Sequence, residues 1–147
     1  MKDNNNLCDY NVWSGTDYNK NTQSYYNTSA CNINSNNNFS INGEHSINFS
    51  TNESSSWPYL DCGRISGISG KITAELTVYA PKGYIRAVLY ANPNENIVIT
   101  DVYQNDKPQK IVLSGDIPAN YQYLTVRLFP RNDNVTYYVD DITFINK

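Results

Sequence analysis

Long apolar runs are missing from this sequence. Its uninterrupted apolar stretches are only a few residues long, whereas a transmembrane helix needs about 20 apolar residues. The N-terminus also lacks a charged segment followed by an apolar one, so the chain as given shows no signal peptide. We therefore expect no membrane insertion. If the protein is exported, its signal has been removed or the chain is one domain of a larger protein.

An excess of charge of one sign is missing as well. The 11 Lys and Arg residues and 14 Asp and Glu residues are scattered along the chain, and the formal net charge is −3. Proteins that bind nucleic acid carry a basic patch or stripe. We therefore expect no nucleic-acid partner.

Catalytic motifs are equally scarce. The only histidine, His45, lies in a strand-like segment, where a lone histidine is more often structural than catalytic. Phosphate-binding glycine loops, nucleophile elbows and HExxH motifs are absent. Asp61 and Asp101 stand singly in turn or surface patterns, and the adjacent Asp140 and Asp141 would point to opposite faces of a strand. Glycoside hydrolases need two carboxyl groups that face each other across a cleft, so we predict that this domain is not an enzyme.

Cysteine is rare. Cys8, Cys31 and Cys62 are 23 and 31 residues apart, and zinc motifs usually place two ligands within a few residues of each other. This spacing argues against a zinc site. One disulfide with one remaining thiol and three reduced, buried cysteines both stay open, and the sequence does not rank the three pairings.

A sustained 3.6-residue apolar period is also missing, so helix should be nearly absent. Residues 71–80 instead alternate strictly between apolar and polar side chains, and similar strands are expected over 84–91, 96–103, 109–113, 121–129 and 135–145. Turn residues separate these strands, as at 81–83 and 92–95. At 147 residues the chain is the size of one domain, so we predict one all-β antiparallel sandwich over residues 1–147. The predicted core consists of Ile72, Leu76, Val78, Ile85, Leu89, Leu124, Val126, Leu128, Ile142 and Phe144.

The closing strand carries two adjacent carboxylates. Strict alternation would place Tyr138, Ile142 and Phe144 toward the core, so one of Asp140 and Asp141 would point the same way. A buried carboxylate needs a partner, and a cation, backbone N–H groups and an arginine are all candidates. Calcium, which prefers carboxylate and carbonyl oxygens, is the one cofactor that this pattern favours.

Tyrosine is abundant, with 13 residues against four phenylalanines. Tyrosine combines an aromatic face with a polar group, which suits a half-wet surface. Tyrosines and arginines alternate with the core residues of two predicted strands, and they would form one outward patch if those strands share a sheet. Sugar rings stack on aromatic faces while their hydroxyls need polar partners, although tyrosines and arginines also pair across any open sheet. The candidate ligand-binding residues are Tyr84, Arg86, Tyr90, Tyr123 and Arg127, with Tyr103 at the border and Trp57 and Tyr59 as loop contacts.

Four segments resemble jelly-roll carbohydrate-binding modules of the kind found beside xylanases and glucanases. They are residues 43–49, 76–80, 124–128 and the closing 138–142, and the asparagine-rich N-terminal third departs from the pattern. The resemblance implies a non-catalytic domain that tethers a larger extracellular protein to a polysaccharide or cell-wall glycan. It also implies a structural Ca²⁺ at Asp140 or Asp141, with Glu44 as a companion ligand.

A second function stays open. Asparagine-rich domains of this kind also resemble pieces of large adhesin-like surface proteins, in which the sandwich spaces or docks other domains. Both functions place the domain outside the cell or on its surface. The five Asn-x-Ser/Thr sequons agree with that location, and they lie at Asn27, Asn38, Asn48, Asn52 and Asn134.

Overall fold

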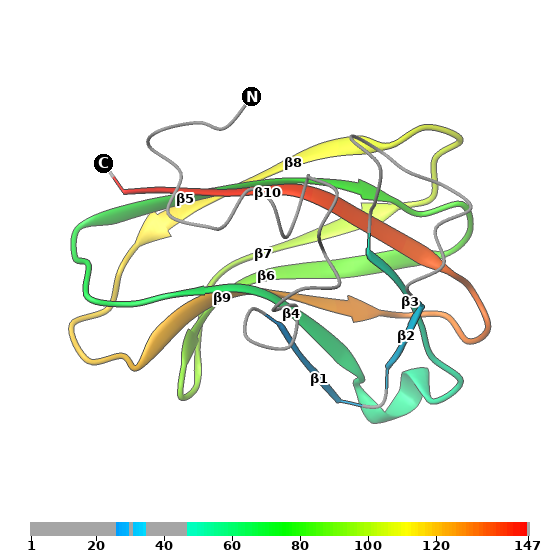
Figure 1. The fold of residues 1–147 in the computed structure, drawn as a ribbon, viewed down its shortest axis with the longest axis horizontal. Coiled ribbons are helices and arrows are strands. Elements are labelled where there is room, and N and C mark those ends of the chain that lie inside the picture. Colours follow the sequence, from blue (N-terminus) through cyan, green and yellow to red (C-terminus); the bar gives the residue numbers. More distant parts are fainter. Residues whose placement is uncertain (1–25, 30, 35–46, 147) are drawn as a thin grey trace.

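The structure is a computed structural model, and it describes residues 26–29, 31–34 and 47–146. These residues form ten strands and one 3₁₀ turn (Figure 1). The elements are β1 (Tyr26–Ser29), β2 (Asn32–Asn34), β3 (Ile47–Ser50), η1 (Ser54–Ser56), β4 (Tyr59–Ile65), β5 (Lys71–Tyr79), β6 (Tyr84–Asn92), β7 (Glu95–Tyr103), β8 (Gln109–Asp116), β9 (Tyr123–Pro130) and β10 (Tyr137–Asn146).

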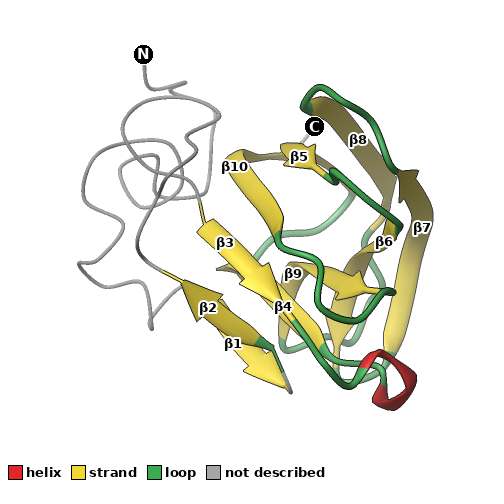
Figure 2. Cartoon of the chain, turned by 90° about the vertical axis from the view of Figure 1, so that its right-hand side faces the viewer, coloured by secondary structure: helices red, strands yellow, loops and turns green. Residues whose placement is uncertain are grey.

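The strands form two five-stranded antiparallel sheets that face each other (Figure 2). The first sheet has the order β1-β4-β9-β6-β7, and the second has the order β2-β3-β10-β5-β8. Strands that are distant in sequence lie side by side in both sheets, as β4 and β9 do. The predicted all-β antiparallel sandwich is confirmed. Within the described residues, no helix has the length and apolar composition needed to span a membrane.

The core lies between the two sheets and is built from the alternating apolar side chains. All ten residues predicted for it are at most 1% exposed. Phe49, Leu60, Leu113 and Tyr137 complete its largest buried side chains. Alternation predicts these strands well because each strand has one face against the core and the other toward solvent. A two-residue period of apolar side chains arises from that arrangement.

Strand β4 was missed by the sequence analysis, and its local geometry explains why. Gly63 adopts a positive φ of 72°, and the pairing with β9 shifts register between Cys62 and Ile65. A glycine of this kind inside a strand accompanies a β-bulge, which breaks the two-residue alternation. The omission matters because β4 carries Tyr59 and Asp61.

The closing strand β10 also contains a bulge, and it corrects one expectation. The register with β5 shifts between Asp140 and Thr143, so that Asp141 and Ile142 together lie opposite the single residue Leu76. The extra residue changes which positions face the core. Val139 and Ile142 are buried, whereas Tyr138 is half-buried and packs on Tyr79 with ring centroids 5.5 Å apart. The expectation that Tyr138 shares the inward face of Ile142 is therefore wrong.

The cysteines are placed only in part. Neither Cys31 nor Cys62 forms a disulfide, and Cys62 lies fully buried in the core. Burial raises the pKa of the Cys31 thiol to about 12, so this thiol stays protonated at neutral pH. Cys8 lies outside the described residues, as do His45 and Glu44.

We predict that truncating a predicted core residue destabilises the fold strongly. Leu89 is 0% exposed, and Leu89→Ala should lower the free energy of unfolding by about 2–5 kcal/mol, because a cavity replaces the lost side chain. Val112→Ala is the control, since Val112 is 55% exposed and its truncation should change stability by about 0.5 kcal/mol or less. Urea denaturation measures both. Equal effects for the two variants would contradict the assigned core.

Candidate functional site

The predicted ligand residues gather on the outer face of the β1-β4-β9-β6-β7 sheet. Strands β6 and β9 are neighbours in this sheet, as the predicted patch required. Arg86 lies opposite Asp101 on β7 and Phe129 on β9, and Arg127 lies opposite Asp61 on β4. We call this surface the tyrosine face, which consists of Trp57, Tyr59, Asp61, Arg64, Tyr84, Arg86, Tyr90, Asp101, Tyr103, Tyr123, Arg127, Phe129 and Arg131.

A nearly buried ion pair occupies the centre of the tyrosine face. Arg127 donates from Nε to Asp61 Oδ1 at 2.7 Å and from Nη2 to Asp61 Oδ2 at 3.0 Å, which makes a bidentate pair. The exposed fraction is 15% for the Arg127 side chain and 3% for the Asp61 side chain. The guanidinium carbon lies 3.9 Å from the ring centroids of both Tyr59 and Tyr90, a cation–π arrangement with two aromatic partners.

Burial and the neighbouring arginine act in opposite directions on the pKa of the Asp61 carboxyl. Loss of solvation raises the pKa of the Asp61 carboxyl above its ordinary value, and the hydrogen bonds and charge of Arg127 oppose that shift. Both carboxylate oxygens accept a hydrogen bond from the arginine, and these bonds favour the charged form of the carboxyl.

A second bidentate pair lies nearer to solvent. Arg86 donates from Nε to Asp101 Oδ1 at 2.9 Å and from Nη2 to Asp101 Oδ2 at 3.3 Å. The hydrogen bonds and charge of Asp101 raise the pKa of the guanidinium. Both aspartates were expected to lie singly in surface or turn patterns, whereas the structure places them in β4 and β7. Each is an ion-pair partner on a neighbouring strand, and their register could not be inferred from either segment alone.

The centre of the tyrosine face is almost fully buried, and we call this part, formed by Val88, Tyr90 and Thr125, the floor of the face. Val88 and Thr125 belong to its outward positions, yet they are 1% and 0% exposed, and Tyr90 is only 8% exposed. The Arg127 guanidinium covers Tyr90, and the Tyr90 hydroxyl donates to the Pro93 carbonyl. Tyr90 was expected to point outward without supporting the fold. The structure corrects this: Tyr90 is a packed residue, whose removal would leave a cavity.

The accessible aromatic rings lie at the edges of this floor. Tyr103 is 64% exposed and stacks on Tyr84, with centroids 5.5 Å apart and an interplanar angle of 28°. Trp57 is 47% exposed and meets Phe129 edge to face at 5.7 Å. Tyr59 packs on the same phenylalanine at 6.0 Å. The face therefore combines two exposed rings with a polar centre.

Trp57 is held in an uncommon backbone conformation at the end of η1. Its φ of 55° and ψ of 55° lie in the left-handed region, which costs a residue with a side chain roughly 1–2 kcal/mol. Arg131 stacks over the indole at 3.6 Å and donates from Nη1 to the Ser54 carbonyl at 2.6 Å. Asp133 Oδ1 accepts a hydrogen bond from the Ser54 N–H at 2.8 Å. These contacts pin the loop that presents Trp57.

Besides Asp61, Arg64 and Asp101, three residues around Trp57 were not among the predicted site residues: Phe129, Arg131 and Asp133. A sequence signal existed for two of them. Phe129 and Arg131 continue the two-residue alternation that starts with Tyr123 and Arg127, so they belong on the same face as those residues. Asp133 lies in a turn, and only the fold brings it to η1.

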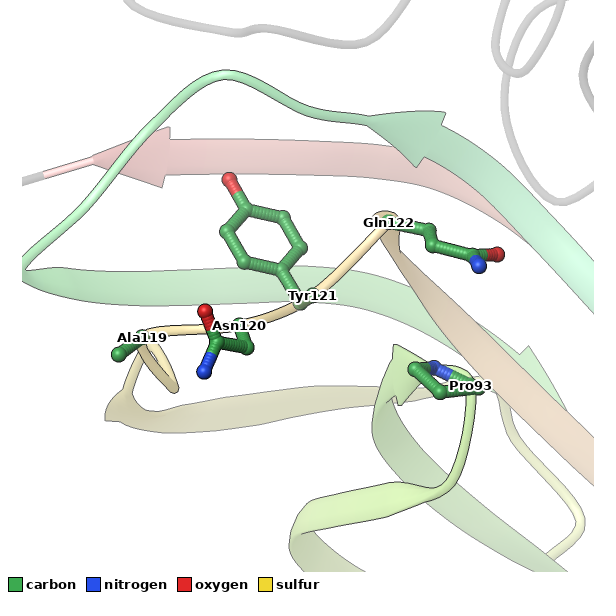
Figure 3. Close-up of a pocket in the computed structure, with 5 residues that line it drawn as sticks. All are labelled: Pro93, Ala119, Asn120, Tyr121 and Gln122. Atoms are coloured by element: carbon green, nitrogen blue, oxygen red, sulfur yellow. The ribbon is translucent and has the colours of Figure 1, made fainter.

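The other end of the tyrosine face borders a pocket. The Arg64 guanidinium lies 3.9 Å from the centroid of Tyr123, whose hydroxyl accepts a hydrogen bond from Asn92 Nδ2 at 3.2 Å. Beyond Asn92, two loops enclose an open pocket of about 400 Å³ (Figure 3). It is lined by Pro93, Ala119, Asn120, Tyr121 and Gln122.

The pocket is closed at its inner side by hydrogen bonds between loops. The Tyr121 hydroxyl donates to the Ile68 carbonyl at 2.6 Å and accepts from the Ile68 N–H at 2.8 Å. The Gln122 N–H donates to the Asn92 carbonyl at 2.8 Å. Tyr121 therefore ties its loop to the loop at Ile68, and its side chain packs against the hydrophobic core.

The predicted calcium residues are only partly described. Asp140 lies at the β10 bulge and is 0% exposed. Glu44 and the side chain of Asp141 lie outside the part of the chain that the structure describes. Among the described residues, no group of three or more His, Cys, Asp or Glu side chains could hold a metal ion. Calcium stays a prediction.

We predict that the two ion pairs differ in their contribution to stability. Asp61→Asn leaves Arg127 without a carboxylate in a largely desolvated position and should lower the free energy of unfolding by about 3–5 kcal/mol. Asp101→Asn is the matched control at the exposed pair and should have a much smaller effect. Thermal melts of both variants provide the measurement. A larger loss for Asp101→Asn would show that the central pair has been assigned the wrong role.

No family model and no curated protein matches this sequence. Comparison with solved structures gives clear similarities in fold. A family 4 carbohydrate-binding module has a TM-score of 0.61 and 12% identity, with 84% of this chain and 96% of that chain covered. The N-terminal cellulose-binding domain of β-1,4-glucanase C from Cellulomonas fimi has a TM-score of 0.60 and 11% identity, covering 84% and 89%.

A third similar structure is the C-terminal family 22 carbohydrate-binding module of xylanase Xyn10B from Clostridium thermocellum. Its TM-score is 0.59 at 10% identity, with 86% of this chain and 87% of that chain covered. At this identity the likeness shows the fold. The chain therefore has the jelly-roll β-sandwich fold of carbohydrate-binding modules, in agreement with the resemblance found in the sequence.

Proposed function

We propose that this domain is a non-catalytic carbohydrate-binding module that tethers a larger extracellular protein to a polysaccharide or cell-wall glycan. The observation that carries the proposal is the tyrosine face. It is a closed, rigid floor with exposed aromatic rings at its edges and hydrogen-bonding groups between them. Such a surface suits a sugar chain, which needs flat apolar contacts and polar partners at the same time.

The rings have different tasks in this proposal. Tyr103 and Trp57 are the most exposed aromatic residues of the face, so they stack on pyranose rings. Tyr59, Tyr84 and Tyr123 are half-buried and contribute ring edges and hydroxyls. Arg86 and Asp101 supply hydrogen bonds to sugar hydroxyls between the stacking positions. Arg127 and Tyr90 hold the floor in place.

The chemistry of the face supports binding over catalysis. Asp61 and Asp101 are its carboxylates, and each accepts two hydrogen bonds from an arginine. A general acid must be able to carry and release a proton at the glycosidic oxygen, and a nucleophile needs an unshielded oxygen. Carboxylates engaged in bidentate pairs suit neither task. Several similar solved structures are carbohydrate-binding modules, including one in complex with β-1,4-galactotriose, and another is an enzymatically active tailspike domain of bacteriophage CBA120.

A second candidate, a docking domain of a cell-surface adhesin, has one observation in its favour. Ile99 on β7 is 49% exposed and lies opposite Val88, so it adds an aliphatic side chain to the tyrosine face, while Val112 on β8 is 55% exposed at the edge of the other sheet. Exposed aliphatic side chains suit protein contacts better than sugar hydroxyls. Binding of the isolated domain to polysaccharide gels separates this candidate from the first.

We predict that removing the exposed rings abolishes sugar retention. Tyr103→Ala and Trp57→Ala should each weaken binding about two- to tenfold, as expected for the loss of one aromatic contact, and the double variant should be lost from the gel. Affinity electrophoresis in gels that contain β-glucan, xylan or galactan measures the effect.

Tyr79→Ala is the matched control, because Tyr79 is a half-buried tyrosine on the opposite sheet. Its retention should stay at the level of the unsubstituted domain. Thermal melts should confirm that every variant is folded. Full retention of the Tyr103→Ala and Trp57→Ala double variant would place the sugar site elsewhere.

A structural calcium ion at Asp140 or Asp141, with Glu44, is part of the proposal. Its support is that Asp140 is a carboxylate held at the β10 bulge, and carboxylate oxygens are among the ligands that Ca²⁺ prefers. We predict that the melting temperature rises on addition of CaCl₂ and falls on addition of EDTA, since a ligand of the native state adds stability by mass action. Identical melting curves in CaCl₂ and EDTA would rule the ion out.

A further inference from the structure

Two arginines of the tyrosine face already hold carboxylates of this chain. A guanidinium recognises a carboxylate best through two parallel N–H groups, which form a fork that matches both oxygens. In Arg86 and in Arg127, the Nε and Nη2 groups form that fork, and both are used by Asp101 and Asp61 respectively. The Nε–Nη2 edge of each arginine, which would otherwise be able to capture an acidic sugar, is therefore occupied by a carboxylate of the protein itself.

The charges within the two ion pairs point the same way. The pairs Arg86 with Asp101 and Arg127 with Asp61 each have a formal charge of zero. The Asp101 side chain is 24% exposed, so an approaching sugar carboxylate meets a negative group beside Arg86. Like charges brought together at an interface cost several kcal/mol.

The remaining arginines of the face are also engaged. Arg131 lies against Trp57 and binds the Ser54 carbonyl. Arg64 stacks on Tyr123, and its charge also acts on Asp61, lowering the pKa of that carboxyl. An exposed arginine of this kind attracts a carboxylate only weakly, by about 1 kcal/mol at 4 Å in water.

We infer that the tyrosine face is selective for uncharged glycan chains and discriminates against chains that carry carboxylates, because the Asp61 and Asp101 side chains occupy the Nε–Nη2 edges of Arg127 and Arg86 with negative charge. This inference rests on the proposed function and sets its substrate class. Arg86 and Asp101 act together as a specificity pair. The arginine contributes hydrogen bonds to hydroxyls, and the aspartate blocks the acid.

The experiment compares each polymer with its own oxidised form. Barley β-glucan and galactan are used before and after oxidation of the C6 alcohols to carboxylates, so backbone and linkage are shared and only charge differs. The unsubstituted domain should bind the oxidised polymer about tenfold or more weakly than the native one at low salt. Binding is measured by affinity electrophoresis and isothermal titration calorimetry.

The Asp101→Asn variant tests the mechanism of discrimination. It frees the bidentate edge of Arg86, so affinity for the oxidised polymer should rise roughly two- to fivefold, as expected for an exposed ion pair. Raising the salt concentration should cancel this gain, and so should adding Arg86→Gln in the same background. An Asp101→Asn variant that gains nothing on the oxidised polymer would overturn the role given to the pair.

The outcomes separate the inference from the proposed function. Binding of the oxidised polymer as tight as that of the native one, or tighter, would overturn the inference and leave sugar binding intact. If such binding disappeared in Arg64→Gln, the acid would be held by Arg64 instead. Retention on none of the polymers would overturn the proposed function, and the inference with it.

Discussion

The bidentate pair between Asp61 and Arg127 organises the candidate site. It joins β4 to β9 across the sheet, and the arginine fills the space between the rings of Tyr59 and Tyr90. Desolvating two charges is costly, and the cost is offset here by two short hydrogen bonds and two aromatic faces. Because one guanidinium makes all these contacts, three strands are fixed relative to each other at this point.

This central pair determines which groups of the face are accessible. Tyr90, Thr125 and Val88 form a floor with little exposure, and the accessible rings of Tyr103 and Trp57 lie at its edges. Arg131 and Asp133 lie on the turn after β9 and bind Ser54, the first residue of η1. Together with the stacking of Arg131 on the indole, these contacts hold Trp57 in its left-handed conformation. Because the floor is packed and side-chain contacts hold the loop that carries Trp57, the protein loses less conformational freedom when a sugar chain binds.

The sequence predicted the elements that depend on local pattern alone. Strands β5 to β9 were all expected from alternation and turn residues, and every residue assigned to the core is buried. The pattern failed where a bulge interrupts it. Gly63 and the register shift in β4 hid a strand that carries half of the central pair, and the bulge in β10 reversed the face expected for Tyr138.

The sequence predicted which residues share the face of the candidate site, but it did not predict which of them contact each other. Tyr84, Arg86, Tyr123 and Arg127 could be assigned to one face because alternation within a strand is a local property. Pairing of Arg86 with Asp101 and of Arg127 with Asp61 depends on the register between strands, and the burial of Tyr90 depends on where a long arginine side chain rests. These are tertiary properties, which no single segment encodes.

The central claim is that a sugar chain lies on the tyrosine face. Backbone amide chemical-shift mapping by NMR, with a neutral β-glucan oligosaccharide titrated into the ¹⁵N-labelled domain, tests this claim most directly. The account predicts that the largest shifts fall in β4, β6, β7 and β9 and at Trp57, with little change in β5 and β8. Shifts concentrated on β5, β8 and β10, or confined to the loop at residues 119–122, would contradict it.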